Sequence, residues 1–124
     1  MLGTRDLMRT ARFYDAVFAA LGEARAWTDA TSVSWGRFGA EGGTSFCICL
    51  PFDGDPASAG NGVMVALRTS SEAMVRAAHE AALAAGGLDE GEPGPRPQYG
   101  IGFFAAYVRD LDGNKLAFAY QAPD

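Results

Sequence analysis

Apolar residues recur with the helical period near the start of the chain. Between residues 6 and 21 these positions are Leu7, Phe13, Tyr14, Val17, Phe18 and Leu21. Such spacing places them on one face and predicts an amphipathic helix. Asp6 or Thr4 can cap the first turn by accepting hydrogen bonds from backbone N–H groups, and Gly22 stands where a helix commonly ends.

A second helix is predicted over residues 72–85, which are rich in alanine. It is preceded by Thr69-Ser70-Ser71-Glu72, a capping box in which a hydroxyl and a carboxylate satisfy backbone donors of the first turn. Gly86 and Gly87 follow it, as Gly22 follows the first helix.

Six shorter segments are rich in apolar and aromatic residues and are bounded by turn-forming residues. They predict strands at residues 24–28, 32–38, 45–50, 63–67, 103–109 and 115–120. The intervening segments contain glycine, proline and aspartate. They predict a hairpin at residues 39–43, a crossover linker at 51–62, a Pro/Gly loop at 91–97 and a hairpin with an Asp-Gly pair at 110–114.

The order of these elements repeats. Each half contains a helix followed by strands, and the glycines that end the helices, Gly22 and Gly86, are 64 residues apart. This indicates an internal duplication, with the opening strand of the first copy cut short at Met1.

The composition fits one globular domain. The 124 residues are 48% hydrophobic and 20% charged, unlike a disordered chain. We predict a single α+β domain, residues 1–124, with module one at about residues 1–51, a linker at 52–62 and module two at about 63–124. The two modules are expected to share one curved mixed β-sheet, with a pocket in its concave face.

The charge balance argues against several kinds of partner. Fifteen acidic residues outnumber ten basic ones, and the pI is near 4.7. Nucleic-acid binding needs clustered Lys and Arg, so we expect no nucleic-acid partner. The apolar stretches at residues 46–52 and 101–108 are too short to span a bilayer, and the first residues do not form a signal peptide. We therefore expect a cytoplasmic protein with no membrane partner.

Cysteine and histidine are scarce. Cys47 and Cys49 lie two residues apart in one predicted strand, too close for an ordinary disulfide and too few for a zinc cage, so packing as small hydrophobes is expected. His79 is the single histidine and cannot by itself provide a two-histidine metal site.

Several motifs occur in the order of a known family. They are residues 2–7, 13–15, 51–54, 60–62, 84–87 and 107–115, the last containing Asp110-Leu111-Asp112-Gly113-Asn114. Together they resemble the vicinal oxygen chelate superfamily, which includes glyoxalase I, extradiol dioxygenases and bleomycin-resistance proteins. The resemblance covers nearly the whole chain and implies a fold of two βαβββ modules.

The resemblance also implies where metal ligands would lie. The family's first ligand would precede Met1. Its second falls on Met64, its glutamate falls on Ala117, and a further histidine of close relatives falls on Gly100, directly after Tyr99. None of these three side chains offers a hard donor for a divalent metal. We therefore expect no metal cofactor, the alternative being one divalent metal held by unrecognised ligands.

Strand alternation predicts which residues line the concave face. In module two, Met64 and Ala117 mark this face, Tyr107 lies opposite Ala117 across the hairpin, and Tyr99 is a further candidate. Tyr107 would donate to a ligand oxygen or satisfy its hydroxyl against the backbone.

The duplication extends the predicted pocket to module one. Matching the last strand of each module makes Trp35, Arg37, Cys47 and Cys49 pocket candidates. Each has a structural alternative: sheet packing for Trp35, exposure to solvent for Arg37, and inert packing for the cysteines.

Two functions follow from these expectations. The first is a metal-free binding protein that holds a small apolar or aromatic molecule in a homodimer, as resistance proteins of the family sequester drugs. The alternative is a metal-dependent enzyme, a glyoxalase-like lyase or isomerase (lactoylglutathione lyase-like) or a dioxygenase. Its only obvious carboxylates are Glu23, Glu41, Asp53 and Glu90.

Overall fold

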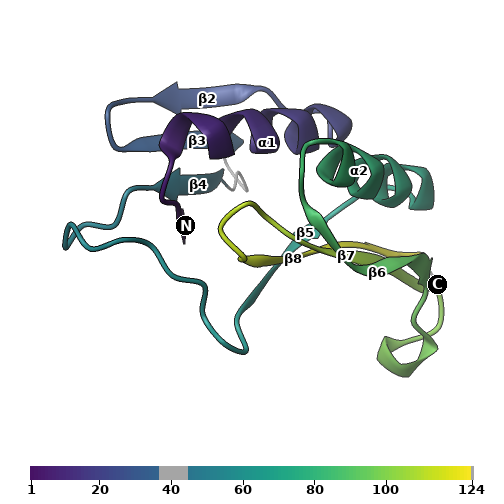
Figure 1. The fold of residues 1–124 in the computed structure, drawn as a ribbon. Coiled ribbons are helices and arrows are strands. Elements are labelled where there is room, and N and C mark those ends of the chain that lie inside the picture. Colours follow the sequence, from purple (N-terminus) through teal and green to yellow (C-terminus); the bar gives the residue numbers. More distant parts are fainter. Residues whose placement is uncertain (37–44, 124) are drawn as a thin grey trace.

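The computed structural model describes residues 1–36 and 45–123 (Figure 1). Module one contains β1 (Leu2–Gly3), α1 (Leu7–Ala20), β2 (Arg25–Thr28), β3 (Ser32–Gly36) and β4 (Ser45–Cys49). Module two contains β5 (Met64–Arg68), α2 (Glu72–Ala84), β6 (Leu88–Pro95), the 3₁₀ helix η1 (Pro97–Tyr99), β7 (Phe103–Arg109) and β8 (Lys115–Gln121). The predicted hairpin at residues 39–43 lies outside the described residues.

The two modules have the same topology. The strand orders are β1-β4-β3-β2 and β5-β8-β7-β6, in which the first pair of each is parallel and the others are antiparallel. The opening strand is present as the short β1, with Leu2 opposite Ile48. The predicted duplication and the α+β fold of two βαβββ modules are confirmed. The strands nevertheless form two sheets rather than one shared sheet, because each module completes its own pairing.

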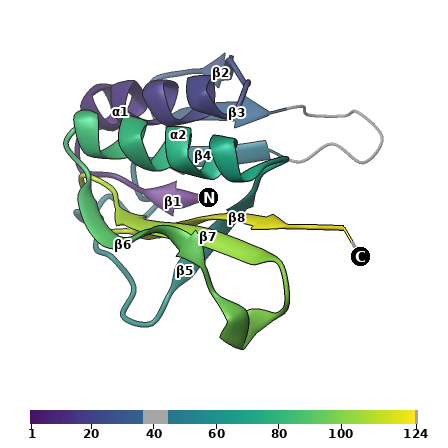
Figure 2. The same cartoon turned by 90° about the vertical axis from the view of Figure 1, so that its right-hand side faces the viewer.

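Local signals explain both helices. Asp6 caps α1 by accepting from the backbone N–H of Arg9, and Ser71 caps α2 by accepting from that of Met74. Beyond the C-terminal ends, Gly22 and Gly86 have φ values of 80° and 101°, which an L side chain rarely adopts. Figure 2 shows the two helices side by side, and they pack against each other.

The strand β6 corrects the prediction of a loop at residues 91–97. Residues up to Pro95 pair with β7, in a ladder whose register shifts twice, between Asp89 and Gly91 and again before Gly94. The glycines and prolines that suggested a loop therefore lie in an irregular strand, where bulges tolerate them. Of the predicted loop, Arg96 and Pro97 lie beyond the end of β6, and Pro97 begins η1.

One hydrophobic core runs through both modules. In module one, the rings of Tyr14 and Phe46 lie 4.7 Å apart, and Phe18 stacks on Trp35 at 5.5 Å. The same cluster of buried side chains continues into module two with Val75, Val108, Leu116 and Phe118. The two sheets are thus parts of one packed unit.

A group of hydrogen bonds around Asp110 and Asp112, called the clasp below, also joins the two modules. The buried Asp110 carboxylate accepts hydrogen bonds from the Tyr14 hydroxyl at 2.6 Å, from the backbone N–H groups of Asp112 and Asn114 at 2.9 Å, and from the Asn114 side chain at 3.0 Å. Burial, and then the Asp110 charge, raise the pKa of Tyr14 well above its usual value. The phenol therefore stays protonated and able to donate.

Asp112, in the same turn as Asp110, completes the clasp by binding residues at and before the start of α1. Its carboxylate accepts from the hydroxyl of Thr4 at 2.6 Å, the hydroxyl of Thr10 at 3.1 Å and the backbone N–H of Arg5 at 2.8 Å. These hydrogen bonds hold the turn between β7 and β8 against module one. They thereby fix the position of β8, which begins at the end of that turn.

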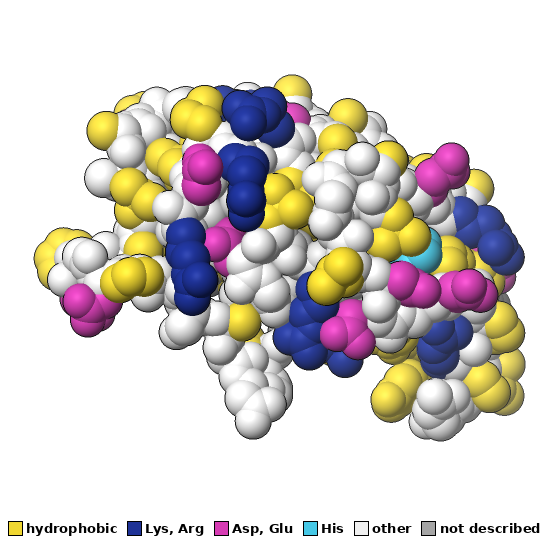
Figure 3. Space-filling model, in the orientation of Figure 1, with side chains coloured by type: hydrophobic (Ala, Val, Ile, Leu, Met, Phe, Trp, Pro, Cys, Tyr) yellow, Lys and Arg dark blue, Asp and Glu magenta, His cyan; other side chains and the backbone are white. Residues whose placement is uncertain are grey.

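The exterior carries mixed charge. Figure 3 shows Lys and Arg side chains beside Asp and Glu side chains on one face of the molecule. Within the described residues, no helix has both the length and the apolar character needed to cross a membrane.

Candidate functional site

A cavity of about 530 Å³ lies against the face of module two's sheet that points away from α2. Strand alternation separates the two faces: Val108, Leu116 and Phe118 point into the core, whereas Tyr107, Ala117 and Ala119 line the cavity.

Small and flexible apolar side chains form the floor of the cavity. Ala66, Ala117 and Ala119 come from the adjacent strands β5 and β8, and Met64 lies at the exposed end of β5. Ala66 lies opposite Ala117 in the parallel ladder. Because alanine leaves space above a sheet, this floor can contact the flat body of a ligand.

Tyr107 stands at one side of this floor between two cations. Its ring centroid is 5.4 Å from the Arg96 guanidinium and 5.6 Å from the Lys115 ammonium, distances at which cation–π attraction operates. Gly91, opposite Tyr107 in the ladder, allows this position, because a Cβ there would approach the tyrosine ring to 2.7 Å.

Aromatic and amide side chains form the outer rim. Tyr99 and Phe103 meet edge to face with their rings 5.9 Å apart, and Gln98 lies beside them on η1. Tyr99 is 65% exposed, so this rim is accessible to a ligand from solvent.

Glu90 is the acidic residue of the cavity. Its carboxylate accepts a hydrogen bond from Arg109 Nε at 2.7 Å. This bond is the main reason that the pKa of Glu90 lies below its usual value, and the nearby Lys115 charge also lowers it. Glu90 is therefore ionised at neutral pH and already paired.

Four of the eight predicted pocket residues come together here. Met64, Tyr99, Tyr107 and Ala117 all line the cavity. Tyr107 lies opposite Ala117 in the β7–β8 ladder, as the hairpin predicts.

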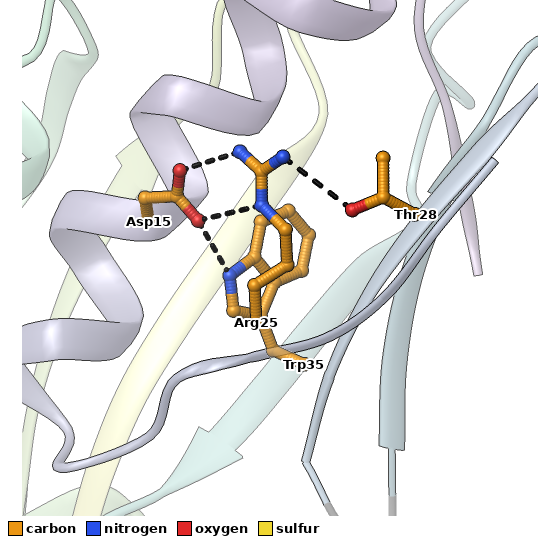
Figure 4. Close-up of polar contacts among 4 residues, drawn as sticks. All are labelled: Asp15, Arg25, Thr28 and Trp35. Atoms are coloured by element: carbon orange, nitrogen blue, oxygen red, sulfur yellow. Dashed lines mark hydrogen bonds and ion pairs between the residues drawn. The ribbon is translucent and has the colours of Figure 1, made fainter. Parts of the chain in front are cut away.

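The structure does not bring Trp35 to an open sheet face. Its indole is fully buried, and its Nε1 donates to Asp15 Oδ1 at 2.9 Å (Figure 4). Arg25 binds the same carboxylate. Trp35 lies opposite Phe46 in the β3–β4 ladder, and both side chains face the core. Through its hydrogen bond to Asp15, the tryptophan connects β3 to α1.

Cys47 and Cys49 lie on the face of module one's sheet that is turned away from α1, and neither lines this cavity. They alternate with the buried Phe46 and Ile48, and Cys47 is opposite Ser34. Both thiols are free and half-buried, and burial is the main cause that raises the pKa of Cys47. A raised pKa makes this thiol a poorer nucleophile at neutral pH. Arg37 and Glu41 lie outside the described residues.

The residues present do not fit a hard divalent metal. Met64 and Ala117, where the resemblance places two ligands, supply a thioether and a methyl group. Glu23, Asp53 and Glu90 line three separate hollows of the surface. Among residues 1–36 and 45–123, no three His, Cys, Asp or Glu side chains are grouped to hold a metal ion.

The described lining of the cavity contains none of the side chains of a Ser-His or Cys-His pair. No histidine, cysteine or serine is among its described lining residues. His79 lies on α2, where its Nε2 is 3.0 Å from Asp89 Oδ1 and ties the helix to β6. What remains is an apolar floor with aromatic walls and a few polar groups, which is the usual composition of a small-molecule site.

The fold and cavity can now be compared with known proteins. A model of the glyoxalase/bleomycin resistance protein/dioxygenase superfamily matches residues 1–118. The chain belongs to this superfamily. A glyoxalase/bleomycin resistance protein from Albidiferax ferrireducens T118, known from its crystal structure, is 32% identical to this superfamily member. The TM-score is 0.86, with 98% of this chain and 95% of that chain covered.

Two further crystal structures show the same fold. A glyoxalase-related enzyme from Fulvimarina pelagi is 25% identical, with a TM-score of 0.72 over 96% of this chain and 83% of that one. A superfamily enzyme from Burkholderia phytofirmans PsJN is 15% identical, with a TM-score of 0.70 over 98% and 94%. No curated protein matches the chain.

The pattern of apolar residues missed Arg96, Gln98 and Phe103 as cavity residues. Arg96 and Gln98 follow the strand that was predicted as a loop, so no alternation indicated where they point. Phe103 begins β7 and shares a face with Tyr107, four residues away, which is a signal that alternation could have supplied.

Proposed function

We propose that this superfamily member is a metal-free binding protein for a small apolar or aromatic molecule, which it holds in the module-two cavity. The observation that carries the proposal is the cavity floor: Met64 and Ala117 stand where the family's metal ligands are expected, within an apolar surface formed with Ala66 and Ala119. Sequestration of a toxic compound, rather than its chemical conversion, is the role such a site fits.

A neutral aromatic probe tests the cavity. We expect biphenylacetamide to bind the wild-type protein in a calorimetric titration, because burial of its rings against the alanine floor is favourable. Ala66→Phe fills this space and should weaken binding at least about tenfold. Ala84→Phe adds the same side chain at an exposed position of α2 and should leave binding unchanged. Equal binding by both variants would contradict the proposed site.

Metal uptake tests the absence of a metal centre. Tag-free protein is dialysed against a mixture of zinc, nickel, manganese and iron salts, and its metal content is then measured. We expect less than stoichiometric metal and a melting temperature unaffected by chelator, because bound metal would raise that temperature. One tightly held metal ion per chain would contradict the metal-free proposal.

We further propose that the protein acts as a homodimer. Met64 and Tyr99, which line the cavity, and Ile101, which follows η1, expose 46%, 65% and 97% of their surfaces, and a second copy covering them would bury apolar area. Light scattering coupled to size exclusion should give twice the mass of the 13.0 kDa chain. A monomer at the highest concentration measured would contradict this arrangement.

A further inference from the structure

Two basic side chains line the cavity without an acidic partner. Within the described part of the chain, no carboxylate oxygen lies within 4.0 Å of the Arg96 or Lys115 nitrogens. The Arg96 guanidinium donates only to the backbone carbonyls of Glu92, at 2.7 Å, and Pro95, at 3.2 Å. These bonds orient the group but leave its charge uncompensated and several of its five N–H donors free.

The two cations converge on one side chain. Both lie within 5.6 Å of the Tyr107 ring centroid, and all three residues are half-buried. The Tyr107 hydroxyl makes no hydrogen bond to another described residue, so it is free to bind a ligand. The chain as a whole carries a net charge of −5. Glu90 of the same cavity is paired with Arg109, so this positive pair can attract small anions although the chain as a whole is negatively charged.

We propose that the cavity selects small aromatic carboxylates, with Arg96 and Lys115 holding the acidic group and the alanine floor contacting the ring. This inference rests on the proposed function and names the ligand class of the same site. A carboxylate matches the planar guanidinium fork of Arg96. A phosphate is commonly held by backbone N–H groups at a helix N-terminus, and η1, the helical turn at this cavity, is only three residues long.

Three probes with the same rings separate the contribution of head-group charge to binding affinity from that of aromatic contact. Biphenylacetate, biphenylacetamide and biphenylmethylphosphonate share their rings and differ in the head group. We expect the wild-type protein to bind the carboxylate at least about tenfold more tightly than the amide. This preference should shrink as salt is raised from low to high concentration, because partly exposed charges are screened.

Matched variants assign the preference to residues. Arg96→Met and Lys115→Met should each weaken carboxylate binding about three- to tenfold. Binding of the amide should stay within about twofold in both variants, which shows that the cavity is intact. Arg76→Met is the control, because Arg76 stacks on Phe104 on the other face of the sheet, 5.0 Å from its ring centroid, and its loss changes the net charge equally. Glu90→Gln removes the negative charge of the cavity and should strengthen carboxylate binding.

The possible failures are distinguishable. Equal affinity of the wild-type protein for carboxylate and amide would overturn this inference and leave the proposed function standing. Failure of all three probes to bind would overturn both. A tenfold preference for the phosphonate over the carboxylate, or an equal loss of carboxylate binding in Arg76→Met, would overturn the assignment of a carboxylate to Arg96 and Lys115.

Discussion

At the scale of the residue, Asp110 is the one acidic residue that is buried among those the structure describes. It is 4% exposed, and its charge is compensated by donors from its own turn and by Tyr14 of module one. A buried carboxylate is stable only with such donors. If it is removed, the donors themselves remain buried and unpaired, which is costly.

We therefore expect Asp110→Ala to lower the free energy of unfolding by about 3–5 kcal/mol. Tyr14→Phe removes one donor while preserving the ring, and should cost about 1–2 kcal/mol. Urea denaturation of both variants measures the difference. A smaller loss for Asp110→Ala than for Tyr14→Phe would show that the turn does not depend on this carboxylate.

The sequence predicted part of this residue-scale picture. The Asp-Gly pair indicated the turn, and alternation from Ala117 correctly placed Tyr107 opposite it. The hydrogen bonds that the Tyr14 hydroxyl donates to Asp110 and the Thr4 hydroxyl donates to Asp112 join residues about a hundred positions apart. No local pattern encodes such contacts, since they depend on how the two modules pack.

At the scale of the element, strand register decides which face a side chain occupies. A shift of one residue inverts every side chain of a strand. The short turn at residues 110–114 fixes the register of β7 against β8. The sequence of residues 37–44, which connect β3 and β4, does not indicate the register of that pair. The structure pairs Trp35 with Phe46 rather than with Cys47, so Trp35 faces the core. Register therefore explains why the four module-two candidates share one cavity whereas Trp35 does not join them.

The strand β6 carries two carboxyls whose pKa values lie below their usual values. The hydrogen bond from His79 is the main cause that lowers the pKa of Asp89, and that from Arg109 is the main cause for Glu90. A carboxyl whose folded pKa is depressed stabilises the fold above its unfolded pKa. This stability is lost as the pH falls through the folded value.

We therefore expect the urea midpoint to decline as the pH falls from about 5 to about 3. The decline should be smaller in the double variant Asp89→Asn/Glu90→Gln, because these two groups no longer titrate. The control is Glu92→Gln, since the Glu92 side chain makes no hydrogen bond to the described residues. An equal decline in the wild-type protein and the double variant would rule out β6 as a source of acid sensitivity.

At the scale of the whole molecule, the clasp and the shared core join the two modules, and we expect the modules to unfold as one cooperative unit. Sequence duplication indicated two similar halves, but not whether they unfold separately. The contacts of α1 with α2, the hydrophobic core and the clasp of Asp110 and Asp112 all cross the boundary between the modules. Disruption of one module should therefore destabilise the other.

The distribution of tryptophan makes this coupling measurable. Both tryptophans, Trp27 and the buried Trp35, belong to module one, so their fluorescence reports on that module, whereas far-ultraviolet circular dichroism reports on both. Leu116→Ala opens a cavity in the core of module two and should cost about 2–5 kcal/mol. We expect it to lower the urea midpoints of both signals equally, as in two-state unfolding. A fluorescence midpoint that stays at its wild-type value while the dichroism midpoint falls would show that the modules unfold independently.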